Sequence, residues 1–368
     1  MKKKLSRREF IKQTSALAAG ALCGGALFKN TVFAIPAKTV KIGVLAPSHC
    51  ALSMIHAKLA GNYKKNGVNA EIVFLPDMKD VAQGLISGEL AAGQLIVTAF
   101  LALNAGSGPF AGQAVPLVTA QIAGTNGGVL VVGKDSPIKM PSDLAGKRIG
   151  VHSPLMVHHI LVKTLLKKYN IDPAKDIQIK IINMEELITS LKKGEIDCFI
   201  NPEPLGTFAE ANGVGRDLIV TRKMWLKHPC CALSMRRDFF ENNMSLAKSL
   251  YLSTIESGLT LNKPESRQGA VERIHNESPA YSKIPLADLN KAFYPGRSDF
   301  DPFPYQSSGR ALLTLMMENN LMPKGVDTEK MISQTFLSDF SRSLLTSLGD
   351  KPPTSNDREE AVMGRLLT

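Results

Sequence analysis

The sequence lacks the short motifs that most often carry catalysis or nucleotide binding. It contains no Gly-x-Ser-x-Gly nucleophile turn and no Gly-x-x-x-x-Gly-Lys phosphate loop ending in Ser or Thr. The glycine-rich stretch 124–128 does not have the Gly-x-Gly-x-x-Gly spacing of a dinucleotide-binding turn. These absences count against nucleophilic catalysis and nucleotide binding. We therefore expect a protein that is not an enzyme and that needs no cofactor.

Cysteine is scarce, and its spacing excludes the common zinc motifs. Four of the five cysteines lie beyond the N-terminal segment, at Cys50, Cys198, Cys230 and Cys231. None of them forms a Cys-x-x-Cys pair, so the sequence predicts no metal site. Adjacent cysteines such as Cys230 and Cys231 rarely bridge each other, because the geometry is strained. We expect buried free thiols, although an oxidising compartment leaves a disulfide open.

The N-terminus has the three parts of an export signal. A basic head at Lys2–Lys4 precedes an apolar, small-residue stretch over 16–28, and Val32–Ala34 supplies a small-residue cleavage site. The apolar stretch is too short to span a membrane. The pair Arg7-Arg8 resembles the twin-arginine signal of folded exported proteins. We expect residues 1–34 to be removed and the twin-arginine export machinery to be a partner, with a Sec signal as the alternative.

Removal of this segment changes the charge balance of the protein. Residues 1–34 hold seven Lys or Arg and one Glu, so their loss lowers the formal net charge from +11 to +5. No clustered basic module remains, so we expect no nucleic-acid partner. Leu22 precedes Cys23 where a lipoprotein site needs a small residue, which favours cleavage near Ala34 over a lipid anchor. The expected location is the periplasm.

One stretch of the chain occurs twice. Lys147–Pro204 repeats, about 106 residues later, the order of features that begins at Lys41: an apolar strand, a Pro–Ser turn, a helix with a basic end, an alternating strand and a helix that ends in Gly-Glu. This period is too long for a solenoid repeat of about 20–50 residues. Strands that alternate with helices predict parallel βαβ units. We expect two similar α/β lobes, each a mostly parallel sheet flanked by helices.

The same pattern suggests the boundaries of the lobes. We assign 39–128 with 236–340 to lobe 1 and 129–235 to lobe 2, with a crossing at the glycine-rich stretch 124–128. The chain after Asn243 is predicted to be helical, with its last helix over Glu329–Leu345. The Pro-, Ser- and charge-rich end, 346–368, is predicted to be a mobile tail.

The two Pro–Ser turns are the best candidates for a binding site. In open α/β sheets, ligands bind beyond the carboxyl ends of the strands, where helix N-termini present free N–H groups. Ser48 and Ser153 lie in these turns, with His49 and Cys50 beside the first and His158 in the helix after the second. Each serine taken alone could equally be a helix cap. Two matching turns in a duplicated chain favour a shared cleft.

Several stretches together resemble the periplasmic solute-binding proteins of ABC importers, in the nitrate/sulfonate/bicarbonate-binding group. The resemblance covers about 39–340 and rests on the order and spacing of its motifs. These are Ser87–Ala92, Asp143–Val151, Gly194–Asp197, Asn201–Pro204 and Trp225–Pro229. It implies the two-lobed periplasmic-binding-protein type II fold, with hinge strands between the lobes and closure around a small ligand. It also implies a membrane permease and an ATPase as partners, and a monomer.

The resemblance also suggests where a ligand would bind. His158 falls where nitrate binders of the group have a His, whereas their Trp, Gln and Gly positions fall near Asp77-Met78, at 127–128 and at Pro202, and their Lys is offset near Lys227. Nitrate, another small anion and an organic solute therefore all stay open. The predicted ligand-binding residues are Ser48, His49, Cys50, Asp77, Met78, Thr98, Thr125, Asn126, Ser153, His158, Pro202, Glu203 and Lys227.

Two alternatives share the same predicted fold. One is an enzyme related to thiamine-pyrimidine synthesis, whose cysteine cluster Cys230-Cys231 matches only in part. The other is a solute receptor that signals to a membrane sensor. The export signal argues against the enzyme, and a permease and ATPase encoded alongside would favour transport over sensing.

Overall fold

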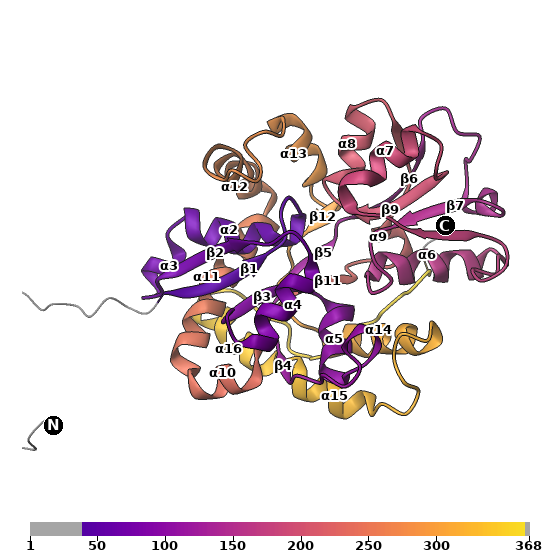
Figure 1. Cartoon of the computed structure of the whole chain (residues 1–368). Helices are drawn as coiled ribbons and strands as arrows, with labels where there is room; N and C mark the ends of the chain where they lie inside the picture. The colour runs from indigo at the N-terminus through magenta and orange to yellow at the C-terminus, as the bar shows by residue number, and fades with distance from the viewer. Residues whose placement is uncertain (1–38, 365–368) are drawn as a thin grey trace, which may run out of the picture. The chain divides into compact units, whose positions relative to one another are not determined.

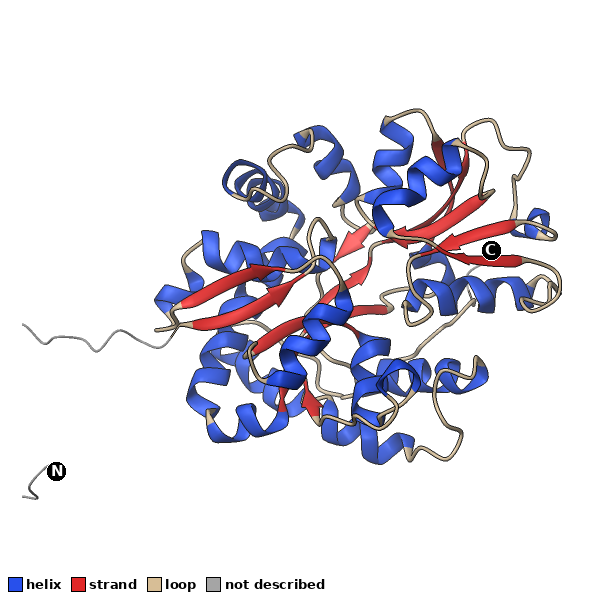
Figure 2. Ribbon diagram, in the orientation of Figure 1, coloured by secondary structure: helices blue, strands red, loops and turns tan. Residues whose placement is uncertain are grey.

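The computed structural model describes residues 39–364, and the predicted export signal lies outside them. The described strands form two sheets, which Figures 1 and 2 show with helices against both. The first sheet contains β1 (Val40–Val44), β2 (Ala70–Phe74), β3 (Ala92–Ile96), β4 (Leu117–Val118), β5 (Ile122–Asn126), β11 (Pro229–Arg236) and β12 (Ser298–Asp299). The second contains β6 (Gly128–Gly133), β7 (Arg148–Val151), β8 (Gln178–Ile181), β9 (Cys198–Pro202) and β10 (Gly215–Val220).

The strand orders confirm the duplication. The first sheet runs β2-β1-β3-β11-β5 through its centre, and the second runs β8-β7-β9-β6-β10. In each sheet, the first three strands of this order are parallel to one another. The fourth strand, β11 or β6, is antiparallel to both of its neighbours. The sheets are therefore mixed rather than mostly parallel, because β6 and β11 each enter a sheet after the chain has crossed from the other one. We call each sheet with its helices a lobe.

The chain crosses between the lobes at a glycine. β5 ends at Asn126 and β6 begins at Gly128, so Gly127, with φ +73°, is the crossing residue. This confirms the crossing predicted at 124–128. The return crossing leads into β11, which pairs in the first sheet. The exact lobe boundaries predicted from the sequence stay a prediction.

The helices up to Met224 follow the expected βαβ pattern. α4 shows why: the Asp77 carboxylate accepts a hydrogen bond from the Lys79 N–H at 2.9 Å and caps the helix, and Gly88, with φ +77°, ends it. These helices are α2 (Leu52–Leu59), α3 (Asn62–Lys65), α4 (Met78–Ser87), α5 (Val97–Ala105), α6 (Val157–Lys168), α7 (Leu187–Lys192), α8 (Leu205–Ala211) and α9 (Thr221–Met224). Short 3₁₀ turns are η1 (His49–Ala51), η2 (Gly108–Phe110), η3 (Pro141–Leu144) and η4 (Met184–Glu186).

The rest of the chain is mainly helical, with one difference from expectation. The predicted helix over Glu329–Leu345 is wrong: it is broken at Phe336–Leu337. There the Thr119 N–H donates to Thr335 and the Leu337 N–H donates to Thr119, so the backbone pairs with the first lobe instead of continuing the helix. The helices are α10 (Arg237–Asn242), α11 (Met244–Asn262), α12 (Pro264–Glu277), α13 (Leu286–Ala292), α14 (Gln306–Glu318), α15 (Thr328–Thr335) and α16 (Ser338–Ser347).

Alternation along β6 shows how the second sheet is covered on both faces. Val129 and Val131 join a core with Phe199 and Leu187, whereas their neighbours in the strand belong to the larger core on the other face.

No helix within residues 39–364 is long and apolar enough to cross a membrane.

The C-terminal segment packs on both lobes within the described residues. The Glu360 carboxylate accepts hydrogen bonds from the Trp225 indole N–H (2.8 Å) and from Ser307 at the start of α14 (2.9 Å). The Met363 N–H donates to the carbonyl of Met224 in α9. A mobile tail is predicted from residue 346, whereas these contacts hold the segment up to Met363 against its neighbours.

Candidate functional site

The two Pro–Ser turns meet at one cleft, as the sequence predicts. A small cavity of about 20 Å³ lies between Ser48 and Cys50 after β1 and His152 and Met156 after β7. Both lobes supply its walls, and we call it the inner chamber. Its lining residues are Leu45, Ser48, Cys50, Met78, Gln94, Ile96, His152, Met156, His158, Met184, Pro202, Cys230 and Cys231. A cavity of this volume holds about one water-sized group.

A larger cavity of about 430 Å³ adjoins the inner chamber, and we call it the outer chamber. The two share Met78, Ile96 and His152, so these three side chains lie between the outer and the inner chamber. Its walls are mostly apolar, with Asp77 beside His152 at 4.0 Å between Oδ2 and Nε2. The outer chamber is lined by Asp77, Met78, Lys79, Gln83, Ile86, Ile96, Ala99, Pro109, Phe110, Gln113, His152, Ser153, Pro154, Leu155 and Ile181.

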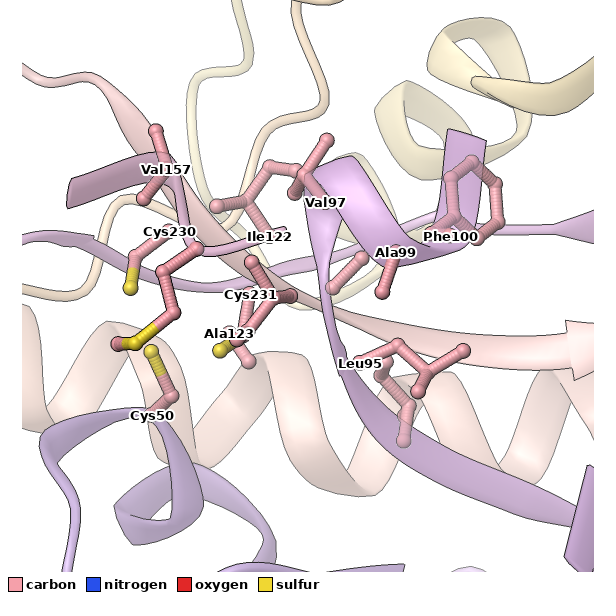
Figure 3. Close-up of a cluster of buried hydrophobic side chains, with 14 of the residues drawn as sticks. Cys50, Leu95, Val97, Ala99, Phe100, Ile122, Ala123, Val157, Cys230 and Cys231 are labelled. Carbon is pink, nitrogen blue, oxygen red and sulfur yellow. The ribbon is translucent and has the colours of Figure 1, made fainter. Parts of the chain in front are cut away.

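Sulfur and imidazole groups dominate the inner chamber. Cys50 comes from η1, and Cys230 and Cys231 come from β11; in Figure 3 the sulfur atoms of Cys50 and Cys230 point toward one another among apolar side chains. The Cys50 Sγ lies 3.3 Å from Nε2 of His49. Burial, followed by the neighbouring thiols, raises the pKa of Cys50. All four cysteines of the described chain are buried and free.

Three buried imidazoles surround these thiols and are neutral at neutral pH. Burial lowers the pKa of His49 to about 4 and that of His228 to about 3, and it lowers the pKa of His158 as well. Both ring nitrogens of His158 lack a hydrogen-bond partner, although only 1% of the residue is exposed. A buried polar side chain without partners indicates a position where a ligand can bind.

The glycines at the crossing make room for these rings. A Cβ added at Gly127 would lie 2.3 Å from Nε2 of His49, and one added at Gly128 would lie 2.3 Å from Nε2 of His158. Such distances are far inside van der Waals contact. The glycines therefore allow imidazoles from both lobes to pack against the crossing strand.

Gly128→Ala is expected to lower the free energy of unfolding by about 1–3 kcal/mol, because His158 or the backbone must move to admit the methyl group. Chemical denaturation measures it. Gly269→Ala is the control: it lies in α12 with nothing within 4 Å of the added carbon, and is expected to stabilise by about 0.5–1 kcal/mol. A Gly128→Ala protein as stable as the parent would contradict the close packing.

The structure brings together seven of the predicted ligand-binding residues at the chamber walls. Ser48, Cys50, Met78, His158 and Pro202 line the inner chamber, and Asp77, Met78 and Ser153 line the outer one. Their part in ligand binding stays a prediction. Ser48 does not cap a helix; its hydroxyl donates to the Leu45 carbonyl at 2.8 Å and accepts from Gln94 at 3.1 Å.

Two further predicted residues lie next to the chambers. His49 is fully buried behind Cys50. Thr98, at the start of α5, donates its hydroxyl hydrogen to the carbonyl of Leu155 in the turn before α6. This hydrogen bond joins the two lobes directly across the cleft.

The other predicted residues have protein partners near the crossing. Asn126 donates to Asp299 at 2.7 Å and accepts from the backbone N–H of Lys227, also at 2.7 Å. The Lys227 ammonium group is half-exposed and pairs with Asp301 at 3.3 Å. Thr125 is buried in β5, and its hydroxyl has no partner. None of these residues lines either chamber.

Glu203 is the most deeply buried charge near the site, and the sequence did not reveal its partner. Arg297, between α13 and β12, donates from Nε to Glu203 at 2.6 Å and from Nη1 to Asp217 at 2.6 Å. Burial raises the pKa of Glu203, and the positive charge of Arg297 lowers it by a smaller amount. Arg297 thus connects the first lobe to two carboxylates of the second. No local motif marks it, because its partners lie 80 and 94 residues away.

Three other residues that line the inner chamber were not predicted from the sequence, for two different reasons. Gln94 is a lone polar residue in an otherwise apolar strand, a signal that could have identified it. It donates to Ser48 and lies 3.7 Å from the Cys231 sulfur. Met156 and Met184 carry no such signal, because a methionine near a helix start usually belongs to the core.

Comparisons with known proteins agree with this architecture. The nitrate/nitrite binding protein NrtA of Nostoc sp. is 22% identical over 234 residues, which cover 59% of this chain and 53% of the relative. NrtA of Synechocystis sp. is 21% identical over 87% of this chain and 79% of the relative. The chain spans only 33% of another curated relative, the nitrate import ATP-binding protein NrtC of Synechocystis sp..

Solved structures confirm the predicted two-lobed periplasmic-binding-protein fold. The periplasmic nitrate-binding protein NrtA from Synechocystis superposes with a TM-score of 0.80 at 20% identity, over 89% of this chain and 94% of that one. The periplasmic aliphatic sulphonate binding protein SsuA from Escherichia coli gives a TM-score of 0.65 at 18% identity, over 81% and 98%. The model of the NMT1-like family matches residues 34–275, well over half of the sequence. The chain therefore belongs to the NMT1-like family, in agreement with the resemblance found in its sequence.

Proposed function

We propose that this protein is the exported solute-binding receptor of an ABC importer, which captures a small solute between its lobes and delivers it to a membrane permease. The observation that carries the proposal is that both lobes supply walls to both chambers. A ligand that contacts both lobes stabilises the closed arrangement over an open one. The hydrogen bond from Thr98 to Leu155 is one contact that opening must break.

The chemistry of the chambers narrows the solute class. No Lys or Arg lines the inner chamber, and Lys79 is the only such residue at the outer one. The polar groups of the inner chamber are a hydroxyl, an amide, imidazoles and thiols, with no carboxylate among them. This environment suits a small ion or solute of low charge, with an apolar portion in the outer chamber. Nitrate, bicarbonate and sulfonates, named for the relatives, are the first candidates.

The names of the relatives support the importer as a whole. They include a nitrate import ATP-binding protein and a bicarbonate transport ATP-binding protein, along with periplasmic binding proteins. We therefore propose a periplasmic location, the export signal at residues 1–34, and partnership with a permease and an ATPase. These names favour a transport role over an enzyme related to thiamine-pyrimidine synthesis.

Thermal unfolding with a panel of solutes tests the proposal. A true ligand at about 100 times its Kd is expected to add about 2.7 kcal/mol to the free energy of unfolding. It should also reduce the radius of gyration in small-angle scattering, because the lobes close. The panel contains nitrate, bicarbonate, alkanesulfonates, taurine and pyrimidine precursors.

A pair of tryptophan variants shows whether the cleft is the site. Met78→Trp places a larger side chain at a wall shared by the two chambers and is expected to abolish the shift. Met140→Trp, on an exposed residue of the second lobe, is expected to keep it. A solute that stabilises both variants equally binds elsewhere. No stabilisation by any member of the panel would contradict the proposed solute class.

A further inference from the structure

We propose that one thiophilic d¹⁰ metal ion, Cu(I) or Zn(II), binds at the wall of the inner chamber through Cys50 and Cys230, which line the chamber, and His49, which lies behind Cys50. The inference deepens the proposed function, since it places the ion in the same cleft and makes it the cargo or an accompanying ion of the receptor. It runs against the sequence-based expectation of no metal site. The spacing rules failed because these ligands come from two segments 180 residues apart.

The ligand atoms are already grouped for metal binding. One atom each from His49, Cys50 and Cys230 lies within 4.8 Å of the others, and all three residues are buried. The pair formed by Cys50 Sγ and His49 Nε2 is separated by 3.3 Å. Bonds of about 2.3 Å to sulfur and about 2.0–2.1 Å to nitrogen place tetrahedral ligands about 3.5 Å apart. Small side-chain shifts are therefore enough to close the site.

The chamber wall around these residues selects a soft ion. Met78, Met156 and Met184 add three thioethers, and His158 adds an imidazole whose two nitrogens have no partner. No Asp or Glu lines the inner chamber. Thiolates and thioethers prefer Cu(I) and Zn(II), whereas Ca²⁺ and Mg²⁺ require oxygen ligands. The cavity, about 20 Å³, has the size of a single ion with little or no water.

Cys231 can supply a fourth ligand, a third cysteine sulfur, where an ion needs one. It follows Cys230 in β11, where the pairing with β5 is irregular on both sides of Cys231. Gln94 donates to its sulfur at 3.7 Å and also donates to Ser48, so a network of hydrogen bonds orients the group. Zn(II) is expected to take four ligands including Cys231, whereas Cu(I) needs only two or three sulfur and nitrogen donors. The two ions therefore differ in their dependence on this residue.

Direct metal titration tests the proposal. The full-length protein, stripped with chelator and kept reduced with a phosphine, is titrated separately with Zn(II) and Cu(I) against chromophoric competitors. We expect one ion per chain to survive gel filtration. Co(II) in place of Zn(II) is expected to give the near-ultraviolet sulfur-to-metal charge-transfer band of thiolate ligation.

Four variants and one control assign the ligands. Cys50→Ser, Cys230→Ser and His49→Gln are each expected to weaken binding at least about 100-fold. Cys198→Ser is the matched control, because Cys198 is equally buried but lies in β9, outside the chamber. Cys231→Ser is expected to weaken Zn(II) binding more than Cu(I) binding. Circular dichroism in chelator establishes that each variant is folded.

Three results would overturn the proposal. They are the absence of a stoichiometric ion in the reduced protein, equal losses in Cys198→Ser and Cys50→Ser, and a Cys50–Cys230 disulfide that forms in the presence of metal. The solute panel above distinguishes this failure from failure of the receptor role. Stabilisation by a solute in a protein that binds no stoichiometric ion refutes the ion alone, whereas stoichiometric metal binding with no stabilisation by any solute and no lobe closure refutes the receptor role alone.

Discussion

Arg297→Met is expected to lower the free energy of unfolding by about 3–5 kcal/mol, because it leaves the buried Glu203 without its partner. The Glu203 side chain is fully buried and the Arg297 side chain is 14% exposed, so water cannot replace the lost interaction. The Asp217 carboxylate, 27% exposed, loses the same partner at less cost. Urea denaturation measures the change.

A second substitution separates the charge from the packing. Glu203→Gln in the Arg297→Met background removes the unpaired carboxylate and is expected to recover most of the lost stability, because replacing both members of a buried ion pair can be nearly neutral. Lys227→Met is the control for an ordinary pair: its half-exposed ion pair with Asp301 is expected to contribute about 0–1 kcal/mol. An Arg297→Met protein no less stable than Lys227→Met would refute the claim that the buried pair connects the lobes.

Trp225→Ala is expected to destabilise the protein by about 3–5 kcal/mol, since it empties the largest fully buried side chain of the described structure. The indole ring lies 6.3 Å from the His228 ring and donates to Glu360 at 2.8 Å. The substitution also removes the hydrogen bond that the indole N–H donates to the Glu360 carboxylate. Thermal and chemical unfolding measure the effect.

Trp225→Phe is the matched control, because phenylalanine fills much of the space but cannot donate to Glu360. Its expected loss is about 1–3 kcal/mol, the cost of leaving a buried acceptor unsatisfied. Glu360→Gln keeps an oxygen that can accept from the indole and from Ser307, but it removes the ion pair between Glu360 and Arg358. If Trp225→Phe were as damaging as Trp225→Ala, ring packing would not be the main contribution.

The sequence predicts the architecture because duplication and periodicity are local properties that a chain displays directly. The strand–Pro–Ser–helix units at Lys41 and Lys147 specify βαβ topology, and the glycine-rich stretch specifies the crossing. The break at Phe336–Leu337 was not predictable in this way, since it depends on pairing with Thr119, more than 200 residues earlier. Tertiary hydrogen bonds outweighed an apolar helical pattern there.

The chamber residues that the sequence predicted lie in or just after the two Pro–Ser turns, or at positions that the family resemblance indicated, such as Met78 and Pro202. Ser48, Cys50 and Ser153 follow strands at the carboxyl edge of a sheet, so topology places them at the cleft. Arg297 and Met184 enter the same region from loops whose positions depend on long-range packing, and no spacing rule identifies them. Glu203 looked like a ligand contact because an isolated carboxylate in a turn does not reveal a buried arginine partner.

The C-terminal segment gives the protein a further link between its lobes, in addition to the two backbone crossings, the Thr98–Leu155 hydrogen bond and the ion pairs of Arg297. Glu360 binds Ser307 on one side and Trp225 on the other, so separating the lobes must either break these hydrogen bonds or carry the segment along. Solute affinity includes the free-energy difference between the open and closed states. Substitutions near the end of the chain are therefore expected to adjust how tightly the proposed receptor retains a solute while every residue that touches the solute stays the same.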